Sequence, residues 1–335
     1  MKKITFRPML LIFFMVIPYI GIGQSKKEIK ENIPLDSIRL SDPFIMPDKA
    51  SKMYYMTGTG GMLWKSKDLK LWTGPYNVVK IDTASWMGPK PMIWAAEIHK
   101  YKNKYYYFAT FTNSAIKITN ENGKVNERRA CHILVSDKAE GPYIPMHEPV
   151  YLPENKSTLD GTFWIDKNNK PYLIYCHEWV QNDDGTVEKI ELKSDLSGTK
   201  GAAEILFKAS NSPWSREENP AFKDQPNKVT DGPYAFRTET GKLGMLWTSW
   251  IYNVYTQGVA YSQSGMLTGP WIQEKDPITP PNYGHGMIFK SFEGQTFMAL
   301  HSHKDNNGNY IRIPKLFKID LSGDKITVQA SGAVN

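Results

Sequence analysis

The segment from residue 231 to residue 271 shows how the chain is organised. It contains Asp231–Tyr234 (DGPY), Lys242–Trp247 (KLGMLW), Val259–Ser262 (VAYS) and Gly269–Trp271 (GPW). A polar cluster opens the segment, and short apolar or aromatic runs follow it, separated by turn-forming residues. Short runs of this kind, bounded by Gly, Pro and Asn, are typical of β-strands. The segment is therefore predicted to form one small antiparallel sheet that begins with a polar cluster.

The same pattern occurs in five units of the sequence. The units open at Asp42, Glu97, Asp160, Asp231 and His285, with spacings of 55, 63, 71 and 54 residues. A repeat of this length with about four strands per unit is typical of a β-propeller. The sequence therefore predicts an all-β fold, a five-bladed β-propeller. A pair of β-sandwiches also has many short strands, but it would not explain why each unit opens with a polar cluster.

The N-terminal residues are predicted to be a targeting segment. Residues 1–23 combine three basic residues with an apolar run from Met9 to Ile22. This is the order of a secretory signal peptide, and the run is too short for a stable membrane span. Residues 24–38 are polar and are predicted to be a leader, and residues 39–335 a single catalytic domain. The protein is therefore expected to be exported, to a periplasm or out of the cell.

The composition excludes several other classes of protein. The net charge is +7, and removal of the three basic residues of the signal peptide leaves 7 − 3 = +4 on the mature chain. Lys and Arg are scattered, so a nucleic-acid partner is not expected. The two cysteines, Cys131 and Cys176, exclude a disulfide-dense scaffold and a Cys-based zinc site. A Cys131–Cys176 disulfide would be permissible after export and stays open.

The five opening residues are predicted to converge at one end of the central channel, because the first strand of each propeller blade lies innermost. Four carboxylates and one imidazole in a small cavity repel one another and raise at least one pKa. Carboxylates in an aromatic-walled pocket suit the hydrolysis of glycosidic bonds. Trp86, Trp94, Trp164 and Trp250 lie near the openings or the inner strand ends. Their indole faces could pack against sugar rings, although large aromatic residues also fill cores.

Taken together and in this order, the unit openings resemble glycoside hydrolase family 43. The resemblance covers Leu40 to about Ile319 and rests on Ser41–Ile45 (SDPFI), Trp94–Ile98 (WAAEI), Leu159–Phe163 (LDGTF) and Gly284–Gly286 (GHG). Ala96 replaces the proline that is usual in the second motif. The resemblance implies a five-bladed propeller and one-step hydrolysis with inversion.

The resemblance also implies roles for individual residues. Asp42 would be the general base, Asp231 the general acid, and Asp160 the residue that raises the pKa of the acid and orients it. The predicted sugar-binding residues are Phe44, Trp94, Glu97, Trp164, Trp250 and Arg312. His285 would lie beside a metal ion or a water molecule. No cofactor is expected to be required, and a cation near His285 would be Ca²⁺ completed by waters. A neutral histidine bonded to the backbone is the alternative.

The fourth unit departs from the family pattern. The family acid is usually a Glu followed by Gly-Pro, whereas this chain has Asp231 before Gly232 and Pro233. Asp is one methylene shorter, and a small displacement of a catalytic group affects the rate strongly. Three interpretations stay open: Asp231 is the acid in an adjusted site, Glu218 takes the role, or the protein binds sugar without turnover.

The substrate is expected to be a plant-type polysaccharide or oligosaccharide. The long segments 76–95 and 197–228 would close a central pocket, which favours release of one terminal sugar. The sequence predicts an α-L-arabinofuranosidase, with β-D-xylosyl release as the second option and a non-catalytic carbohydrate-binding propeller as the rival function. Glu178 is predicted to lie at the pocket rim, and His301 and His303 at a strand end or rim.

Overall fold

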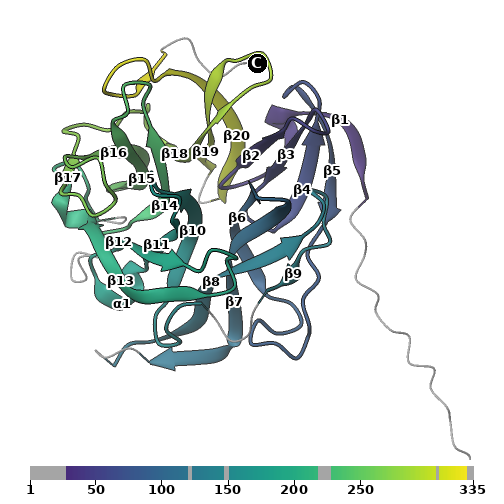
Figure 1. The fold of residues 1–335 in the computed structure, drawn as a ribbon, viewed down its shortest axis with the longest axis horizontal. Coiled ribbons are helices and arrows are strands. Elements are labelled where there is room, and N and C mark those ends of the chain that lie inside the picture. The colour runs from purple at the N-terminus through teal and green to yellow at the C-terminus, as the bar shows by residue number, and fades with distance from the viewer. Residues whose placement is uncertain (1–27, 120–122, 147–150, 218–227, 307–308, 330–335) are drawn as a thin grey trace, which may run out of the picture.

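The computed structural model describes residues 28–119, 123–146, 151–217, 228–306 and 309–329 (Figure 1). Strands dominate these residues, and their helices are α1 (Trp179–Asn182) and the 3-10 turns η1 (Leu35–Ser37) and η2 (Ala209–Asn211). No helix in this part of the chain has the length and apolar character needed to cross a membrane. The prediction of an all-β fold is confirmed. The predicted signal peptide, residues 1–23, lies outside the described residues.

The first sheet corrects the predicted leader. Its strands are ordered β1 (Lys30–Pro34), β5 (Leu71–Asn77), β4 (Met62–Ser66), β3 (Met53–Thr57) and β2 (Phe44–Asp48). β1 lies within the segment 24–38 that was predicted to precede the fold, and it pairs antiparallel with β5. Its side chains are mostly exposed, so only backbone pairing places it in the sheet, and hydrophobicity could not reveal it.

The second and third sheets each have four antiparallel strands in chain order. The second contains β6 (Met92–Tyr101), β7 (Lys104–Thr119), β8 (Val125–Ser136) and β9 (Ile144–Pro145), and the third contains β10 (Thr158–Ile165), β11 (Pro171–His177), β12 (Thr186–Leu192) and β13 (Thr199–Lys208). β13 lies inside the segment 197–228, which was predicted to be an insertion. Cys131 and Cys176 are buried, free thiols.

The fourth sheet consists of two antiparallel groups. The first group is β14 (Asp231–Arg237), β15 (Leu243–Ile251), β16 (Val254–Ser262) and β17 (Trp271–Gln273), and the second is β18 (Tyr283–Lys290), β19 (Thr296–Asn306), β20 (Asn309–Asp320) and β21 (Thr327–Val328). A single parallel pair, Thr256 with Tyr283, joins the groups. The sheet therefore follows the fourth and fifth sequence units.

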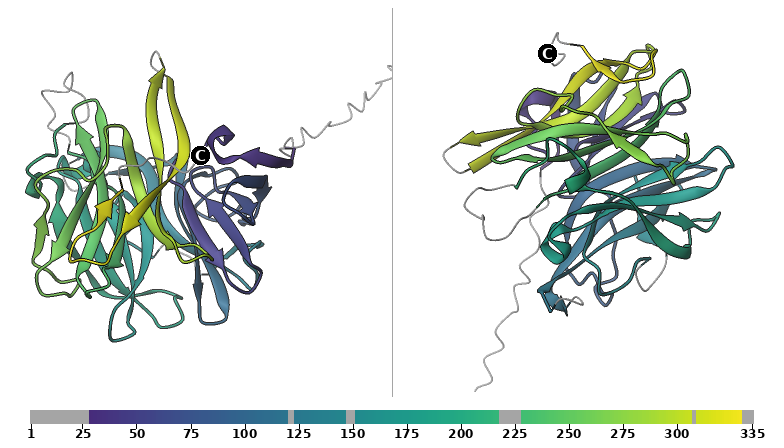
Figure 2. Two further views of the ribbon diagram at one scale, coloured as in Figure 1. Left: turned by 90° about the horizontal axis from the view of Figure 1, so that it is seen from above. Right: turned by 90° about the vertical axis from the view of Figure 1, so that its left-hand side faces the viewer.

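The first strands of the groups surround a common centre (Figure 1). They contact one another in the cyclic order β2, β6, β10, β14, β18 and back to β2. No strand is shared between the last group and the first within the described residues. Figure 2 shows the purple N-terminal strands beside the yellow C-terminal ones. The ring is thus closed by packing and by single hydrogen bonds, such as the one from the Leu40 N–H to the Arg312 carbonyl at 3.1 Å, and by no shared strand among the described residues.

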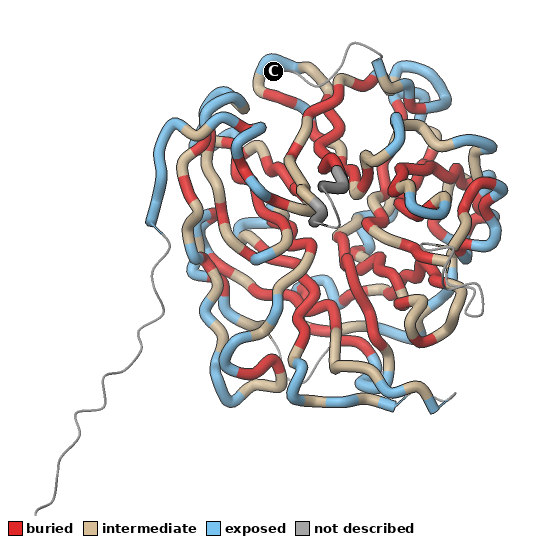
Figure 3. Tube along the Cα trace, turned by 180° about the vertical axis from the view of Figure 1, so that it is seen from behind, coloured by how far each residue is buried: buried red, intermediate tan, exposed pale blue. Residues whose placement is uncertain are grey.

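Apolar side chains from the first and last groups form one core cluster across this closure. Tyr54 of β3 lies against Phe289 of β18 and against Phe292, with ring centroids 6.3 and 4.3 Å apart. Met287, Phe289 and Phe297 belong to the same buried cluster as Tyr54. Burial of apolar surface stabilises the folded state by about 25 cal/mol per Å². Burial of this cluster can therefore hold the first and last groups together without a shared strand. Figure 3 shows the buried residues concentrated toward the interior of the molecule and the exposed residues at its periphery.

The backbone of each first strand is irregular at the same place. Ala95, Asp160, Gly232 and His285 lie at register shifts in β6, β10, β14 and β18, and they have φ values of 42°, 55°, 48° and 56°. Asp42, just before β2, has a φ of 57°. Such bulges re-aim side chains near functional sites.

This finding corrects the predicted equivalence of the five opening residues. Asp42, Asp160 and His285 do share one backbone position, but the fourth member is Gly232 and the second is Ala95. Asp231 lies one residue before that position, and Glu97 lies two residues after it. The prediction aligned charged side chains, whereas the backbone aligns the residues with a left-handed conformation.

Candidate active site

A cavity of about 360 Å³ lies where the first strands begin, a volume typical of small-molecule sites. It is lined by Asp42, Thr59, Trp94, Leu159, Asp160, Glu178, Trp179, Val229, Thr230, Asp231, Trp250, Tyr255, His285, His301 and Arg312. The structure therefore brings together seven of the predicted site residues: Asp42, Asp160, Asp231, Trp94, Trp250, Arg312 and His285.

Asp42 is surrounded by groups that favour its ionised form. The Thr59 hydroxyl donates to its Oδ2 at 2.5 Å, and Nδ1 of His285 lies 3.1 Å from its Oδ1. The backbone N–H of Asp42 donates to Nδ1 of His301 at 3.0 Å, and burial lowers the pKa of His301 to about 3, so this imidazole is neutral. Burial opposes the ionisation of Asp42, but His285, the Thr59 hydroxyl and the charge of Arg312 hold its pKa below the ordinary value.

Asp160 and Asp231 form a pair that retains a proton. Asp160 accepts the backbone N–H of Gly232 at 3.0 Å, and Asp231 accepts the Tyr255 hydroxyl at 2.9 Å. Burial raises the pKa of Asp160 to about 7, and the charge on Asp42 adds to this effect. Burial and the neighbouring Asp160 raise the pKa of Asp231 well above its ordinary value. Two close carboxyl groups cannot both ionise easily, so Asp231 is neutral where Asp42 is charged.

Gly232 allows these groups to approach one another. Its φ is 48°, and a Cβ atom at this position would lie 2.8 Å from the His285 ring. Any side chain here would push His285 away, and Nδ1 of His285 lies only 3.9 Å from Oδ2 of Asp160. The glycine that follows Asp231 is therefore required by the packing of the site.

Asp160→Asn is expected to stabilise the protein at alkaline pH and to lower activity. As pH rises, Asp160 in the unfolded chain ionises near the ordinary aspartate pKa of 3.8, but folded Asp160 ionises only near 7. The folded state therefore loses stability between these values, by up to about 4 kcal/mol for this group. Asparagine removes that loss, so the Tm of the variant should exceed the wild-type Tm by several degrees at pH 8 and match it near pH 4.

Thermal unfolding at both pH values checks this expectation, with Asp137→Asn as the control, since the Asp137 side chain is 81% exposed. A variant that is less stable than wild type at pH 8, or shifted equally at both pH values, would contradict it. The activity should fall by about 10²-fold, because Asp231 loses the neighbour that keeps it protonated.

Three predicted sugar-binding residues do not line the cavity. Phe44 is buried against the His99 ring, with centroids 4.7 Å apart. Oε2 of Glu97 lies 2.6 Å from Nε2 of His99, so its carboxylate is occupied inside the channel. Trp164 lies four residues beyond Asp160 on β10, packed in a core cluster with Arg237 5.8 Å above its ring. These predictions relied on the closeness of Phe44, Glu97 and Trp164 in sequence to the opening residues of the units. In the structure, these three positions lie further along the strands than the residues that line the cavity.

The alternative acid, Glu218, lies outside the described residues. Other lining residues were missed or were placed only at the rim. His301 lies within β19, paired with Gly284 of β18, whereas Thr59 and Glu178 both lie just after the end of the second strand of their units. In an antiparallel pair this end meets the start of the first strand. The ends of the second strands can be predicted from the sequence, and this pairing would have identified Thr59 and Glu178 as residues of the cavity.

Asp160, Asp231 and His285 could approach a common metal ion, since one ligand atom of each lies within 4.8 Å of the others. Ca²⁺ takes six to eight oxygen ligands, so two carboxylates and an imidazole would be a poor direct site. A cation between the carboxylates would also ionise both, which conflicts with the proton they retain. A hydrated ion at the other ring nitrogen of His285 avoids this conflict, and the predicted Ca²⁺ remains a prediction in that form.

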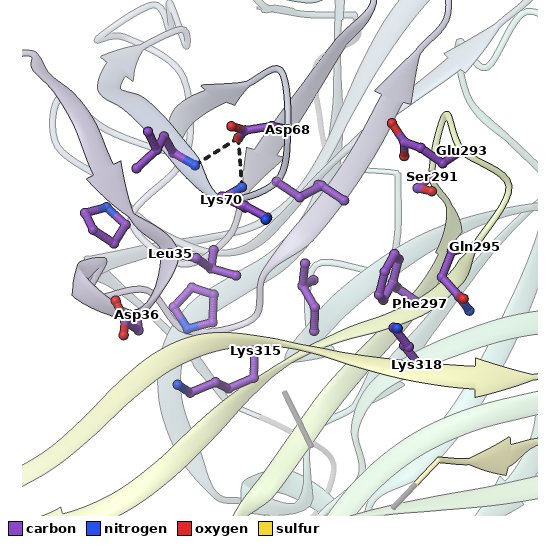
Figure 4. Close-up of a pocket in the computed structure, with 15 residues that line it drawn as sticks. Leu35, Asp36, Asp68, Lys70, Ser291, Glu293, Gln295, Phe297, Lys315 and Lys318 are labelled. Atoms are coloured by element: carbon purple, nitrogen blue, oxygen red, sulfur yellow. Dashed lines mark hydrogen bonds between the residues drawn. The ribbon is translucent and has the colours of Figure 1, made fainter. Parts of the chain in front are cut away.

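A larger cavity, about 450 Å³, lies between η1, the turn before β5, and strands β19 and β20 (Figure 4). The Asp68 carboxylate there accepts the backbone N–H groups of Lys70 and Leu71 at 2.9 Å each. Asp36, Asp68, Lys70 and Glu293 are exposed. Because this cavity has no buried cluster of titratable groups among the described residues, the smaller cavity is the candidate active site.

Comparison with known proteins identifies related sequences and structures. The family model described as Glycosyl hydrolases family 43 matches residues 32–324. A search of curated proteins found no match. A solved structure described as an endo-arabinase from Bacteroides thetaiotaomicron is 33% identical, with a TM-score of 0.75, and the alignment covers 87% of this chain and 97% of that one.

Two further solved structures share the fold at lower identity. One, described as an endo-1,4-β-xylanase from Bacteroides thetaiotaomicron, is 20% identical, with a TM-score of 0.69 and coverage of 92% and 100% of the two chains. Another, described as an exo-1,5-α-L-arabinanase from a bovine ruminal metagenomic library, is 16% identical, with a TM-score of 0.63 and coverage of 87% and 97%.

Proposed function

The chain belongs to glycoside hydrolase family 43, and from this premise we propose that it hydrolyses α-L-arabinofuranosyl linkages in plant-type polysaccharides or oligosaccharides, with inversion. The observation that supports hydrolysis is the opposite protonation of two carboxyl groups in one cavity. The pKa of Asp42 is lowered, and that of Asp231 is raised. Carboxyl groups whose environments separate their pKa values in this way are suited to act as base and acid.

In the proposed reaction, Asp42 accepts a proton from a water molecule whose oxygen bonds to the anomeric carbon. Asp231 donates its proton to the glycosidic oxygen as the bond between that oxygen and the anomeric carbon breaks. The Tyr255 hydroxyl, which donates to Asp231 at 2.9 Å, stabilises the carboxylate that is left behind. Exchange with solvent then returns Asp42 to its ionised form and Asp231 to its neutral form.

The substrate class is supported by the relative described as an endo-arabinase, at 33% identity. The structure described as a xylanase, at 20% identity, supports the fold alone, and release of β-D-xylose is therefore the second option. Trp94, Trp250 and Trp179 line the cavity and could pack against the C–H faces of sugars. The sequence predicts release of terminal units, whereas the relative's description concerns internal cleavage.

Product analysis tests this proposal. The protein should release sugar from linear arabinan or from nitrophenyl α-L-arabinofuranoside faster than from nitrophenyl β-D-xyloside. Time-resolved NMR of the first product should show the anomer opposite to that of the substrate. Arabinose alone as the product of arabinan would establish terminal release, and oligosaccharides would establish internal cleavage. A protein that binds arabino-oligosaccharides and releases no sugar would instead be the carbohydrate-binding propeller, which the shortened Asp231 would permit.

We also propose that the five antiparallel groups are the blades of a five-bladed propeller, and their first strands, which contact one another in cyclic order, support this. Export is proposed from the sequence of residues 1–23. A hydrated Ca²⁺ beside His285 is proposed as a structural ion that takes no part in the reaction. A Tm that is unchanged by chelation and by added Ca²⁺ would count against this ion.

A further inference from the structure

Glu178 and Arg129 form a second polar group in the wall of the cavity, separate from Asp42, Asp160 and Asp231. Glu178 follows β11 and is 7% exposed. Nη1 of Arg129, a residue of β8, donates to Oε1 of Glu178. The proposed mechanism uses neither residue. Both have ionisable side chains and are largely buried, so their place in the cavity wall requires an explanation.

Arg129 is itself fixed by two further contacts. Its Nε donates to the Thr112 hydroxyl at 3.1 Å, and Thr112 is the residue paired with Arg129 between β7 and β8. The guanidinium carbon lies 3.9 Å from the centroid of the Trp94 ring, a distance typical of cation–π contacts. One arginine therefore orients both Glu178 and Trp94, and both of these residues line the cavity.

The second carboxylate oxygen of Glu178 lacks a partner. Oε2 is buried and makes no hydrogen bond to any residue the structure describes. A buried polar atom without a partner costs about 1–3 kcal/mol, and more when it is charged. A ligand that donates a hydrogen bond to such an atom would remove this cost. Since Glu178 lines the cavity, a molecule that enters the cavity is the available partner.

We propose that Glu178 and Trp94 form a sugar-binding subsite beside the reacting carboxyl groups. Oε2 of Glu178 accepts hydrogen bonds from hydroxyl groups of one arabinofuranosyl unit, Trp94 lies against the C–H face of that unit, and Arg129 is a positioning residue. The identity of the sugar rests on the proposed function. Burial raises the pKa of Glu178, and the guanidinium of Arg129 opposes that rise. Binding fits the geometry better than proton donation, because the hydrogen bond from Arg129 occupies Oε1 and leaves Oε2 as a buried acceptor without a partner among the described residues.

Glu178→Gln tests the subsite, with Glu154→Gln as a matched control. Glu154 pairs with Arg128, at 3.2 Å, but its side chain is 65% exposed, and it lies outside the cavity. Arabino-oligosaccharide binding is measured by calorimetry in the Asp42→Asn background, so that no turnover occurs. Glu178→Gln should weaken binding by about 10- to 100-fold, the range for a hydrogen bond to a charged group. Glu154→Gln should leave binding unchanged.

Steady-state kinetics distinguish binding from proton donation. The subsite predicts that Glu178→Gln raises KM for arabino-oligosaccharides with a smaller change in kcat. A loss of kcat on oligosaccharides at unchanged KM, with activity on nitrophenyl arabinoside retained, would identify Glu178 as a proton donor and overturn the proposal. Unchanged binding and KM would also overturn it. Arg129→Lys, which keeps the charge but loses the fork geometry, should show the same direction of effect, provided that Tm shows both variants folded.

Failure of this inference can be separated from failure of the proposed function. If the wild type hydrolyses arabinosides and Glu178→Gln behaves as wild type, only the subsite is wrong. If the wild type binds arabino-oligosaccharides in a Glu178-dependent manner without turnover, only the hydrolase proposal is wrong. If it neither binds nor hydrolyses them, both are wrong.

Discussion

Replacing Asp42 with asparagine is expected to reduce kcat by about 10³- to 10⁴-fold, at the upper end of the range for general acid–base catalysis. Asparagine keeps the size of the side chain and can still accept the Thr59 hydroxyl, which donates to Asp42 at 2.5 Å. It cannot accept a proton from water. The loss should appear equally on arabino-oligosaccharides and on nitrophenyl arabinoside, because both reactions need an activated water molecule.

The matched control is Asp36→Asn. Asp36 is an exposed carboxylate at the larger cavity (Figure 4), so its replacement should leave kcat within about twofold of the wild-type value, the level expected of a surface substitution. Circular dichroism and thermal unfolding establish that both variants are folded. If Asp42→Asn retains near-full activity, Asp42 is not the base. If Asp36→Asn is the inactive variant, the active site has been placed in the wrong cavity.

Asp231→Asn is expected to reduce kcat on arabino-oligosaccharides by about 10²- to 10⁴-fold and to affect nitrophenyl arabinoside much less. Nitrophenolate leaves without a proton, whereas a sugar hydroxyl must be protonated as the bond breaks. The pH dependence should change as well. Asp231 must be protonated to act, and its pKa is raised, so wild-type activity should fall on the alkaline side as Asp231 ionises. Asp42 must be ionised, so activity should fall on the acidic side below its lowered pKa.

In Asp231→Asn the alkaline limb should disappear, while the acidic limb, set by Asp42, should remain. A variant that loses activity equally on both substrates would show that Asp231 has another role. A variant that loses neither activity nor the alkaline limb would transfer the acid role elsewhere, and Glu218→Gln would then be the informative next variant.

The sequence was sufficient to locate many of the strands and three carboxyl groups of the site, but it missed β1 and β13. Alternation of apolar runs with turn residues placed β14 and β15 close to their observed bounds. Asp42, Asp160 and His285 were placed correctly relative to one another because Asp tolerates a positive φ and because each is followed by Pro or Gly. The same signal, a small residue or proline after the bulge, would have selected Ala95 and Gly232.

Side chains that depend on contacts between units could not be assigned from the sequence. Glu97 and Asp231 are both acidic residues near the start of a first strand, yet one is bound to His99 inside the channel and the other faces the cavity. A shift of one or two residues at a bulge decides whether a side chain points into the channel or into the cavity. The residue type alone does not reveal this shift. Arg129 and Thr112 lie in the middle of long strands, where a structural role is the ordinary expectation.

Closure of the ring between its first and last groups means that the proposed reaction centre is completed late in synthesis. Asp42, the proposed base, is among the first residues of the fold to be made, yet the imidazole that accepts its backbone N–H lies 259 positions later in the chain. A ribosome therefore completes four groups of strands before the last group can reach the first. The proposed site is therefore completed last, and a chain that ends before His301 lacks the imidazole that accepts the backbone N–H of the proposed base.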